Sequence, residues 1–263
     1  MTGLNSKQEL NDDFSGLKYI LTSSIRSKLL LTIYERPKNL TDLRDELDKP
    51  SASILHGLKE LENKNLIRKV NKQYQLTSNG ILLTVNMIKL IENWSAVNNS
   101  KIFWNNHDLS DIPDDLLKNI YLLKDAEYVN STTNDLSSAF NTYVKLISNA
   151  EQLTMILPIY SENHFKKIMK ILKQKKLELL ELIISEDLLR SMQRNQLLNE
   201  RILKNEKVNV RKIKKNLKVF LTYSENFMTL SLFFNDGHYD DSQILVAKNK
   251  NAIKWAQLYT TYY

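Results

Sequence analysis

The stretch from residue 22 to residue 76 constrains the fold of this chain more than any other feature of its sequence. A helical segment at residues 25–30 is followed by a shorter one at residues 40–47 and by the turn Asp48-Lys49-Pro50. Pro50 cannot continue a helix but is tolerated in a turn, and Ser51 is a good N-cap for a helix over residues 51–62. The pattern therefore predicts a helix-turn-helix.

Residues 66–70 and 74–76 predict two short strands around a polar tip, Asn71-Lys72-Gln73. Two strands that directly follow a helix-turn-helix are typical of a winged helix, which places its second helix in the major groove of duplex DNA. Double-stranded DNA is therefore the expected partner.

The second helix carries different side chains on its two faces. At ~100° per residue, Ile54, Leu58 and Leu61 share one face, whereas Ser53 and His56 fall on another. Small polar side chains let the helix backbone approach the base edges. A solvated face on an ordinary helix pair would look the same, but the wing that follows favours DNA binding.

The candidate DNA contacts have different expected roles. Side chains of the second helix contact bases or backbone, and the wing lysines contact phosphates, which position a protein without specifying sequence. Ser51 either caps the helix, which is favoured, or touches phosphate. Arg26 either reaches the DNA backbone or is solvated, and both alternatives stay open. The candidate residues are Arg26, Ser51, Ser53, His56, Lys59, Lys69 and Lys72.

Composition narrows the possible functions. The chain has no cysteine, which excludes disulfides and thiolate metal sites, and its five glycines exclude glycine-rich phosphate loops. The chain contains no run of eighteen apolar residues, so no membrane span is predicted. Residues 1–10 also lack the apolar core of a signal peptide. We therefore expect a cytoplasmic protein without membrane contacts, cofactor or metal.

The net charge of +7 is unevenly distributed. Residues 161–220 hold 16 Lys and Arg against 7 Asp and Glu. A second nucleic-acid surface would explain this excess, but solvated helix surfaces are favoured because no aromatic platform is interleaved with the lysines. The same lysines would also draw a small anionic effector toward this part of the chain.

A long helix is predicted from the cap at residues 77–80 to about residue 105. Apolar residues with spacings of 4, 3, 4 and 3 form a heptad seam along it: Leu83, Met87, Leu90, Trp94 and Val97. A second apolar stripe lies beside the seam. One stripe is enough to hold the winged helix, so we favour a homodimer through this helix, with intramolecular packing as the alternative.

The expected domains are a winged helix at residues 1–80, a connecting or dimerisation helix and linker at 81–113, and an α/β domain at 114–263. The domain boundary is placed at an acidic, proline-stopped connector, residues 107–113. The last domain alternates strands and helices, which predicts an α+β or α/β sheet with helices on its faces. The expected strands are 126–130, 153–157, 177–184, 208–213, 219–222, 228–234 and 243–247, and the expected helices are 135–150, 163–174, 186–204 and 251–262.

A ligand pocket is expected where strands of this sheet end. Its candidate residues are Thr154, Pro158, Tyr160, Ser185, Thr222, Tyr239 and Asp240. The last two belong to a polar turn, residues 236–242, which is either a hairpin with local hydrogen bonds or the rim of the pocket.

Catalysis is not expected. His164-Phe165-Lys166 begins like a phosphodiesterase motif, but Ile171 stands where the motif needs an aspartate. His238 is followed by Tyr239-Asp240, so the required second copy is missing as well.

From about residue 15 to the end, the chain resembles the archaeal transcriptional regulators of the methanogenesis-regulatory family. The similar stretches are residues 24–26, 40–47, 53–61, 74–80, 103–113 and 232–242, with Trp255. The most specific are His-Asp-Leu-Ser-Asp-Ile-Pro at 107–113 and the Asp-Gly-x-Tyr-Asp-x-Ser turn at 236–242; the chain departs from the pattern at Ala256, where glycine is usual.

The resemblance implies an archaeal DNA-binding regulator. Its α/β domain would have a sensing or dimerising role and a phospholipase-D-like regulatory topology, and the resemblance supplies no ligand. The alternative is a DNA-architectural protein or co-regulator whose α/β domain binds another protein and no small molecule.

Overall fold

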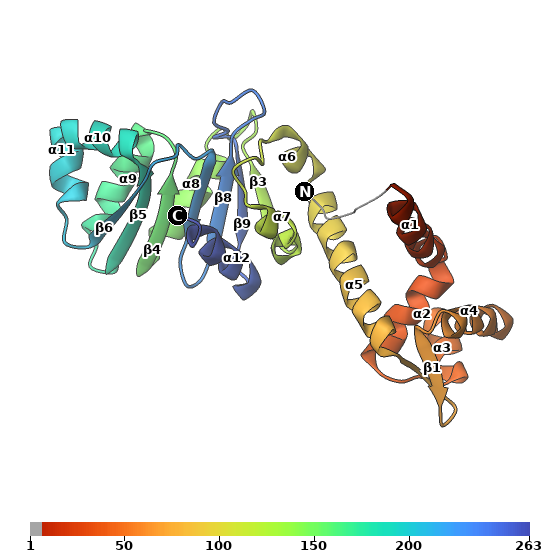
Figure 1. The fold of residues 1–263 in the computed structure, drawn as a ribbon. Coiled ribbons are helices and arrows are strands. Elements are labelled where there is room, and N and C mark those ends of the chain that lie inside the picture. The colour runs from red at the N-terminus through yellow and green to blue at the C-terminus, as the bar shows by residue number, and fades with distance from the viewer. Residues whose placement is uncertain (1–6) are drawn as a thin grey trace. The chain divides into compact units, whose positions relative to one another are not determined.

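The computed structural model describes residues 7–263, and the chain divides into two compact units, Met1–Ile91 and Glu92–Tyr263. Residues 1–6 of the expected first domain lie outside the described residues. The first unit contains the helices and strands that the sequence pattern predicts, in the predicted order (Figure 1). These are α2 (Ser24–Glu35), α3 (Leu40–Leu47), α4 (Ser51–Asn63), β1 (Ile67–Val70), β2 (Gln73–Leu76) and the start of α5 (Ser78–Asn99). A further helix, α1 (Lys7–Leu21), precedes them and was not predicted from the sequence.

The turn of the helix-turn-helix is defined by its caps. Asn39 and Asp42 form a capping box at the start of α3, and Asp48 ends the helix in the left-handed conformation, with φ 47°. Pro50 occupies the N-cap position of α4 in an extended conformation that its ring favours. The expectation that Ser51 caps this helix is therefore wrong, because Ser51 is already its first helical residue.

Two glycines allow elements of the first unit to approach closely. A Cβ on Gly57 would lie 2.9 Å from Leu29, where α4 crosses α2. A Cβ on Gly80 would lie only 1.9 Å from the carbonyl oxygen of Leu66, so the start of α5 rests directly on the backbone that leads into the wing. The wing is also held at β2, because Lys38 exchanges two backbone hydrogen bonds with Tyr74.

The second unit is built on one seven-stranded mixed sheet with the order β3-β9-β8-β7-β4-β5-β6. Strands β4, β5 and β6 are parallel, and the remaining neighbours are antiparallel. The strands are β3 (Glu127–Asn130), β4 (Gln152–Leu157), β5 (Leu179–Ser185), β6 (Val208–Ile213), β7 (Val219–Tyr223), β8 (Met228–Leu232) and β9 (Gln243–Ala247).

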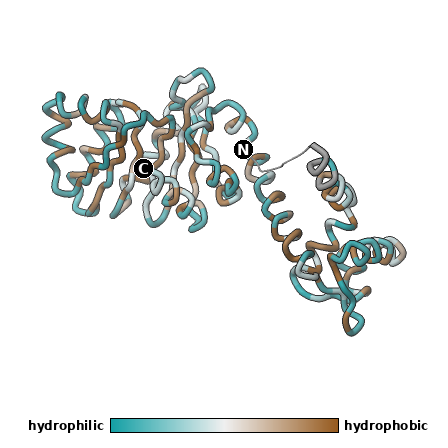
Figure 2. The backbone as a smooth tube through the Cα atoms, viewed as in Figure 1, coloured by the Kyte–Doolittle hydropathy of each residue, from teal (hydrophilic) through white to brown (hydrophobic). Residues whose placement is uncertain are grey.

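Helices cover both faces of this sheet, whose strands are hydrophobic along much of their length (Figure 2). The buried apolar side chains form two cores, one on each face. One face packs against α8 (Ser138–Ile147), α9 (Glu162–Leu172), α10 (Glu186–Arg194), α11 (Gln196–Leu198) and the π-helix η2 (Asn199–Leu203). The other packs against α6 (Lys101–Asn106), α7 (Asp114–Leu117), the 3₁₀ helix η1 (Ile120–Leu123) and α12 (Lys250–Thr260). The mixed α and β composition expected for this part of the chain is confirmed.

Two predicted helices are divided in the structure. The helix expected over residues 186–204 consists of α10, α11 and η2, because the extended residue Asn195 ends α10 and caps the next turn. The long helix expected to reach residue 105 ends at Asn99, and α6 begins after Ser100. Phe103 and Trp104 of α6 are thereby buried in the core of the second unit.

Residues 107–113, expected as a connector, are also part of the second unit. Asp108 accepts a hydrogen bond from Lys218 Nζ at 2.7 Å, and Asp111 accepts one from the Lys218 backbone at 2.7 Å. Tyr259 of α12 donates a hydrogen bond to the Asp111 carbonyl oxygen at 2.8 Å. The second unit therefore begins before this segment, at residue 92, and not after it.

Candidate functional site

Helix α4 presents an exposed face beside its buried one. Ile54, Leu58 and Leu61 are buried in the core of the first unit, as their spacing predicts. His56 and Lys59 are exposed, the His56 side chain by 75%, whereas Ser53 is half-buried. The exposed surface also includes Leu55, Ala52 and the half-buried Ser51. Groove-binding helices contact the thymine methyl group through such apolar side chains.

The wing ends in a turn whose two central residues are both left-handed. Val70 pairs with Gln73, and Asn71 and Lys72 between them have φ values of 49° and 65°. Positive φ at both central positions is the mark of a type I′ turn, in which the second position usually holds glycine. Lys72 therefore keeps a long cationic side chain at a position that disfavours any side chain, and that side chain is exposed at the tip.

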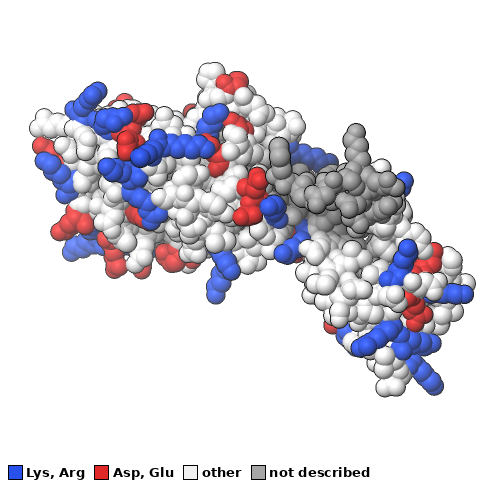
Figure 3. All heavy atoms as spheres, in the orientation of Figure 1, with Lys and Arg blue, Asp and Glu red and all other residues white. Residues whose placement is uncertain are grey.

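Basic side chains gather on the wing (Figure 3). Lys69 and Lys72 are exposed, and Lys69 Nζ lies 5.1 Å from the centre of the Tyr74 ring. Arg68 is exposed as well, and it was not among the predicted contacts. In a strand with one buried face Arg68 and Lys69 would point to opposite sides, but only Ile67 of β1 is buried, so both side chains are free to reach a phosphate backbone.

The side chain of Arg26 is bonded inside the first unit and does not extend toward a DNA-binding surface. Its guanidinium group donates to the Tyr19 carbonyl oxygen and to Glu60 Oε2 at 2.7 Å, and it lies 3.8 Å from the centre of the Tyr19 ring. The side chain is only 14% exposed. Hydrogen bonds from Tyr19 and then Arg26 lower the pKa of Glu60, which keeps the partner carboxylate ionised. Arg26 therefore joins α1, α2 and α4 and has little surface left for DNA.

The residues predicted to line a ligand pocket are not gathered at one place. Ser185 caps α10, Thr154 lies near Glu181, and Thr222 is buried against the Tyr143 hydroxyl. Tyr160 is exposed and lies against Phe165, and Pro158 is half-buried at the end of β4. Asp240 is buried in a hydrogen bond with His107, so it does not face a ligand. Of the predicted set, Tyr239 alone lines the pocket described next.

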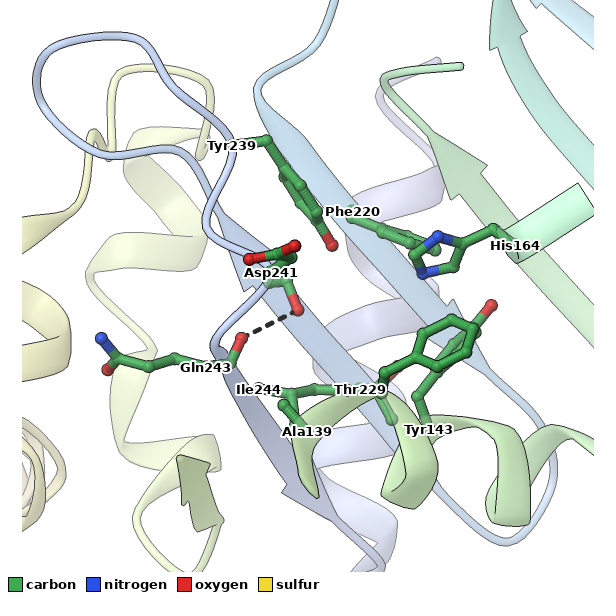
Figure 4. Close-up of a pocket in the computed structure, with 11 residues that line it drawn as sticks. Ala139, Tyr143, His164, Phe220, Thr229, Tyr239, Asp241, Gln243 and Ile244 are labelled. Atoms are coloured by element: carbon green, nitrogen blue, oxygen red, sulfur yellow. Dashed lines mark hydrogen bonds between the residues drawn. The ribbon is translucent and has the colours of Figure 1, made fainter. Parts of the chain in front are cut away.

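That pocket, here called the aromatic pocket, lies between α8, α9 and the strands β7 to β9. Figure 4 shows the rings of Tyr143, His164, Phe220 and Tyr239 around one space, with Asp241 at its edge. Its free volume is about 30 Å³. The lining residues are Ala139, Phe140, Tyr143, His164, Phe220, Thr229, Ser231, Tyr239, Asp241, Gln243 and Ile244.

The aromatic pocket keeps its histidine uncharged. Burial lowers the pKa of His164 to about 4, and its Nδ1 shares a hydrogen bond of 2.8 Å with Ser161 Oγ. Lys166, the third residue of the phosphodiesterase-like triplet, is exposed on α9 and pairs with Glu162 at 2.6 Å. His164 and Lys166 therefore do not form a shared site. Among the side chains that the structure describes, no group of three His, Asp or Glu is arranged to hold a metal ion.

The heptad seam on α5 serves two different environments. Met87 is buried in the core of the first unit, and Leu83 packs against the same core. Leu90, Trp94 and Val97 are exposed, Leu90 by 55% and Trp94 by 64%. Part of the seam is thus used within the chain, and the rest presents large apolar side chains to the surface.

No helix in the described part of the chain is long and apolar enough to cross a membrane.

Comparison with known proteins identifies relatives of both units. Residues 14–94 match the family model for the N-terminal domain of methanogenesis regulatory protein FilR1, and residues 136–263 match the model for its middle domain. Methanogenesis regulatory protein FilR1 of Methanothrix harundinacea (strain 6Ac) is 25% identical over 253 residues, which cover 94% of this chain and 56% of that protein. The chain thus spans little more than half the length of this relative.

Two solved structures illustrate weaker likenesses. TrmBL2, an archaeal chromatin protein, aligns over 91% of this chain and 92% of its own, with 11% identity and a TM-score of 0.39. MepR, a transcription regulator of the Staphylococcus aureus efflux pump MepA, aligns over 35% of this chain and 73% of its own, with 19% identity and a TM-score of 0.29. At such TM-scores neither structure carries an argument about this chain.

Proposed function

Because the chain belongs to the methanogenesis regulatory protein FilR1 family, we propose that it is a DNA-binding transcriptional regulator. The observation that carries the proposal is the geometry of the first unit. An exposed helix face with His56 and Lys59 is followed by a wing whose basic side chains, Arg68, Lys69 and Lys72, are exposed. In winged helices such a helix enters the major groove and such a wing contacts the backbone.

The proposed contacts divide by role. Ser53, His56 and Lys59 contact base edges or the nearby backbone, Ser51 at the start of α4 contacts phosphate, and the wing lysines contact phosphates. Arg26 leaves this set, because its donors are used inside the first unit.

The test is a salt titration of duplex DNA binding by the full chain, followed by fluorescence anisotropy. The double variant Lys69→Ala/Lys72→Ala should flatten the slope of log affinity against log salt by about two units, since each phosphate contact contributes about 0.9. Lys170→Ala, which removes an exposed lysine of α9, is the matched control and should bind as the wild type does. An unchanged slope in the double variant would contradict the proposed wing contacts.

We propose further that the regulator is a homodimer through α5. Leu90, Trp94 and Val97 are exposed apolar side chains on one helix, and burying such side chains against a second copy is favourable. A two-fold dimer would present its recognition helices to two half-sites of a palindromic operator.

For the second unit we propose a sensing role without catalysis. The aromatic pocket supports this, because it is lined by side chains from both helices and strands, so occupancy could couple to the packing of this unit. The mixed sheet with helices on both faces is compatible with the phospholipase-D-like topology that the family resemblance implies.

The competing candidate is a co-regulator whose second unit binds another protein. Thermal shift of the full chain against small molecules separates the two, because only a sensing unit is stabilised by a ligand in the pocket.

A further inference from the structure

We infer that the aromatic pocket binds a small protonated amine of the size of methylammonium. The inference rests on the sensing role proposed above and names the chemical class of its ligand. It is carried by three properties of the pocket: how its rings are inclined, which charges border it, and how much room it has.

The rings enclose a space and do not form a stack. His164 lies 4.8 Å from Phe220 at an interplanar angle of 61° and 5.1 Å from Phe140 at 82°. Tyr143 and Tyr239 lie 5.4 Å and 6.1 Å from Phe220, inclined at 66° and 39°. All five of these residues line the same pocket, so a ligand there would lie among several aromatic rings. The negative face of an aromatic ring attracts a cation, and the attraction is strongest where water is excluded.

The charges that border the pocket favour a cation over an anion. Among the residues that line it, Asp241 carries the one full charge at neutral pH, and none is Lys or Arg. Burial raises the pKa of Tyr143 and Tyr239 and lowers that of His164, so these three groups stay neutral. An anion would lose its hydration and gain no opposite charge, which is unfavourable.

His164 can accept a hydrogen bond from the ligand. Its Nδ1 shares a hydrogen bond with Ser161 Oγ, and no described residue bonds Nε2. If Nδ1 carries the hydrogen and donates to Ser161, Nε2 presents a lone pair, because a neutral imidazole has one donor and one acceptor. The imidazole extends into the pocket, where an ammonium group would donate to it (Figure 4).

The size of the pocket limits the ligand. A free volume of about 30 Å³ exceeds the space needed for one water and is far below that of a nucleotide site. Two or three heavy atoms fit without rearrangement. The basic helix surfaces at residues 161–220 do not line the pocket, so they provide no reason to expect a larger anionic ligand in it.

Ligand-observed NMR with the full chain tests the inference. Methylammonium chloride at neutral pH should bind with an upfield shift of its methyl resonance, caused by the surrounding rings, whereas neutral methanol and sodium acetate should show little or none. Asp241→Asn removes the exposed charge at the pocket edge and should weaken methylammonium binding by up to about fivefold. Phe140→Leu removes one ring face at a half-buried site and should weaken it several-fold.

The matched control is Asp236→Asn, which removes an exposed carboxylate from the same turn outside the pocket lining and should leave binding unchanged. Thermal melts establish that each variant is folded. Acetate bound as tightly as methylammonium, methylammonium binding that both pocket variants retain, or no methylammonium binding by the wild type would each overturn the inference. The measurement uses no DNA, so its failure leaves the DNA-binding proposal standing, and a failure of DNA binding leaves this one standing.

Discussion

His107 Nε2 lies 3.0 Å from Asp240 Oδ2, and both side chains are fully buried. The pair joins residues 107–113 to the turn at residues 236–242, the two stretches that resemble the family most specifically. His107 Nδ1 lies 2.6 Å from the Phe103 carbonyl oxygen, which can only accept, so Nδ1 carries a hydrogen. Asp240 Oδ1 also accepts two hydrogen bonds from Ser242, so both oxygens of this buried carboxylate have hydrogen-bond partners.

Removing one member of this pair should destabilise the second unit. Asp240→Asn and His107→Gln each leave a buried polar side chain without its partner, at a cost of about 1–3 kcal/mol in the free energy of unfolding. Urea unfolding followed by tryptophan fluorescence measures it. His238→Gln, at an exposed histidine of the same turn, should cost almost nothing. Equal midpoints for His107→Gln and His238→Gln would contradict the assigned pair.

The same pair predicts a dependence on acid. Burial raises the pKa of Asp240, but hydrogen bonds from His107 and Ser242 outweigh it and hold the pKa below 3.8. A depressed carboxylate pKa contributes stability that is complete above the unfolded pKa and is lost as the pH falls through the folded one. The second unit should therefore lose stability below about pH 4. In Asp240→Asn this group no longer titrates, so the difference from the wild type in urea midpoint should shrink as the pH is lowered.

Gly80→Ala should disrupt the attachment of the wing to α5. The new Cβ would lie 1.9 Å from the Leu66 carbonyl oxygen, and backbone must move to relieve this overlap. We expect a loss of more than about 3 kcal/mol, measured by thermal or urea unfolding of the first unit. Gly16→Ala is the matched control. Nothing lies within 4 Å of its Cβ, and it should stabilise α1 by up to about 1 kcal/mol.

Lys72→Gly should change stability and DNA affinity in opposite directions. Glycine relieves the left-handed conformation of this residue, which should raise the stability of the first unit by about 1 kcal/mol. It also removes one phosphate contact and should lower affinity for all DNA sequences while flattening the salt slope by about one unit. Lys72→Ala shares the loss of affinity without the gain in stability. A Lys72→Gly protein that binds DNA as tightly as the wild type would show that the lysine is not a contact.

Arg26→Ala should lower the stability of the first unit before it alters DNA recognition. The variant loses hydrogen bonds to Tyr19 and Glu60 and leaves the half-buried Glu60 carboxylate without its cation, a cost of about 2–3 kcal/mol. His56→Ala should do the reverse. His56 is exposed, so its loss should leave the melting temperature unchanged and weaken specific binding by about 1–3 kcal/mol relative to non-specific binding.

Leu90→Glu should convert the proposed dimer to a monomer. Leu90 is 55% exposed within its own chain, so the substitution should not unfold the first unit. Light scattering measures the mass, and melting temperature establishes the fold. Leu136→Glu, which also places a charge at a highly exposed leucine, should leave the mass unchanged. A monomeric wild type would contradict the proposed dimer directly.

The helix-turn-helix and wing could be predicted because their signals are local. Pro50 marks the turn, and the spacing of Ile54, Leu58 and Leu61 marks the buried face of α4 within one helix. Most strands of the second unit could be placed as well, since their apolar runs are bounded by polar turns. The order of the strands in the sheet could not, because pairing β7 beside β4 joins segments that have no shared pattern in sequence.

Contacts between side chains that are far apart in the sequence could not be predicted. Arg26 resembles a solvated surface residue until α4 brings Glu60 beside it, 34 positions away. From the sequence Asp240 is a candidate to face a ligand, but in the structure it is hydrogen-bonded to His107, 133 positions away. The aromatic pocket draws on α8, α9 and three strands, so apart from Tyr239 its lining could not be gathered from any single stretch. The two stretches that resemble the family most specifically, residues 107–113 and 236–242, are the ones that the hydrogen bond between His107 and Asp240 joins.

Residues 92–113 belong to the second unit, and this determines where the chain can be cut into two stable parts. Proteolysis or gene recombination at residue 113 would carry off Phe103, Trp104 and His107, and would leave Asp240 as a lone buried charge. The exchangeable part of this architecture therefore ends inside α5, near residues 91 and 92, where none of the buried salt bridges between described side chains is cut. Regulators that trade one winged helix for another while keeping their second half would be expected to join there, in mid-helix, and to inherit the acidic segment together with the sheet that it completes.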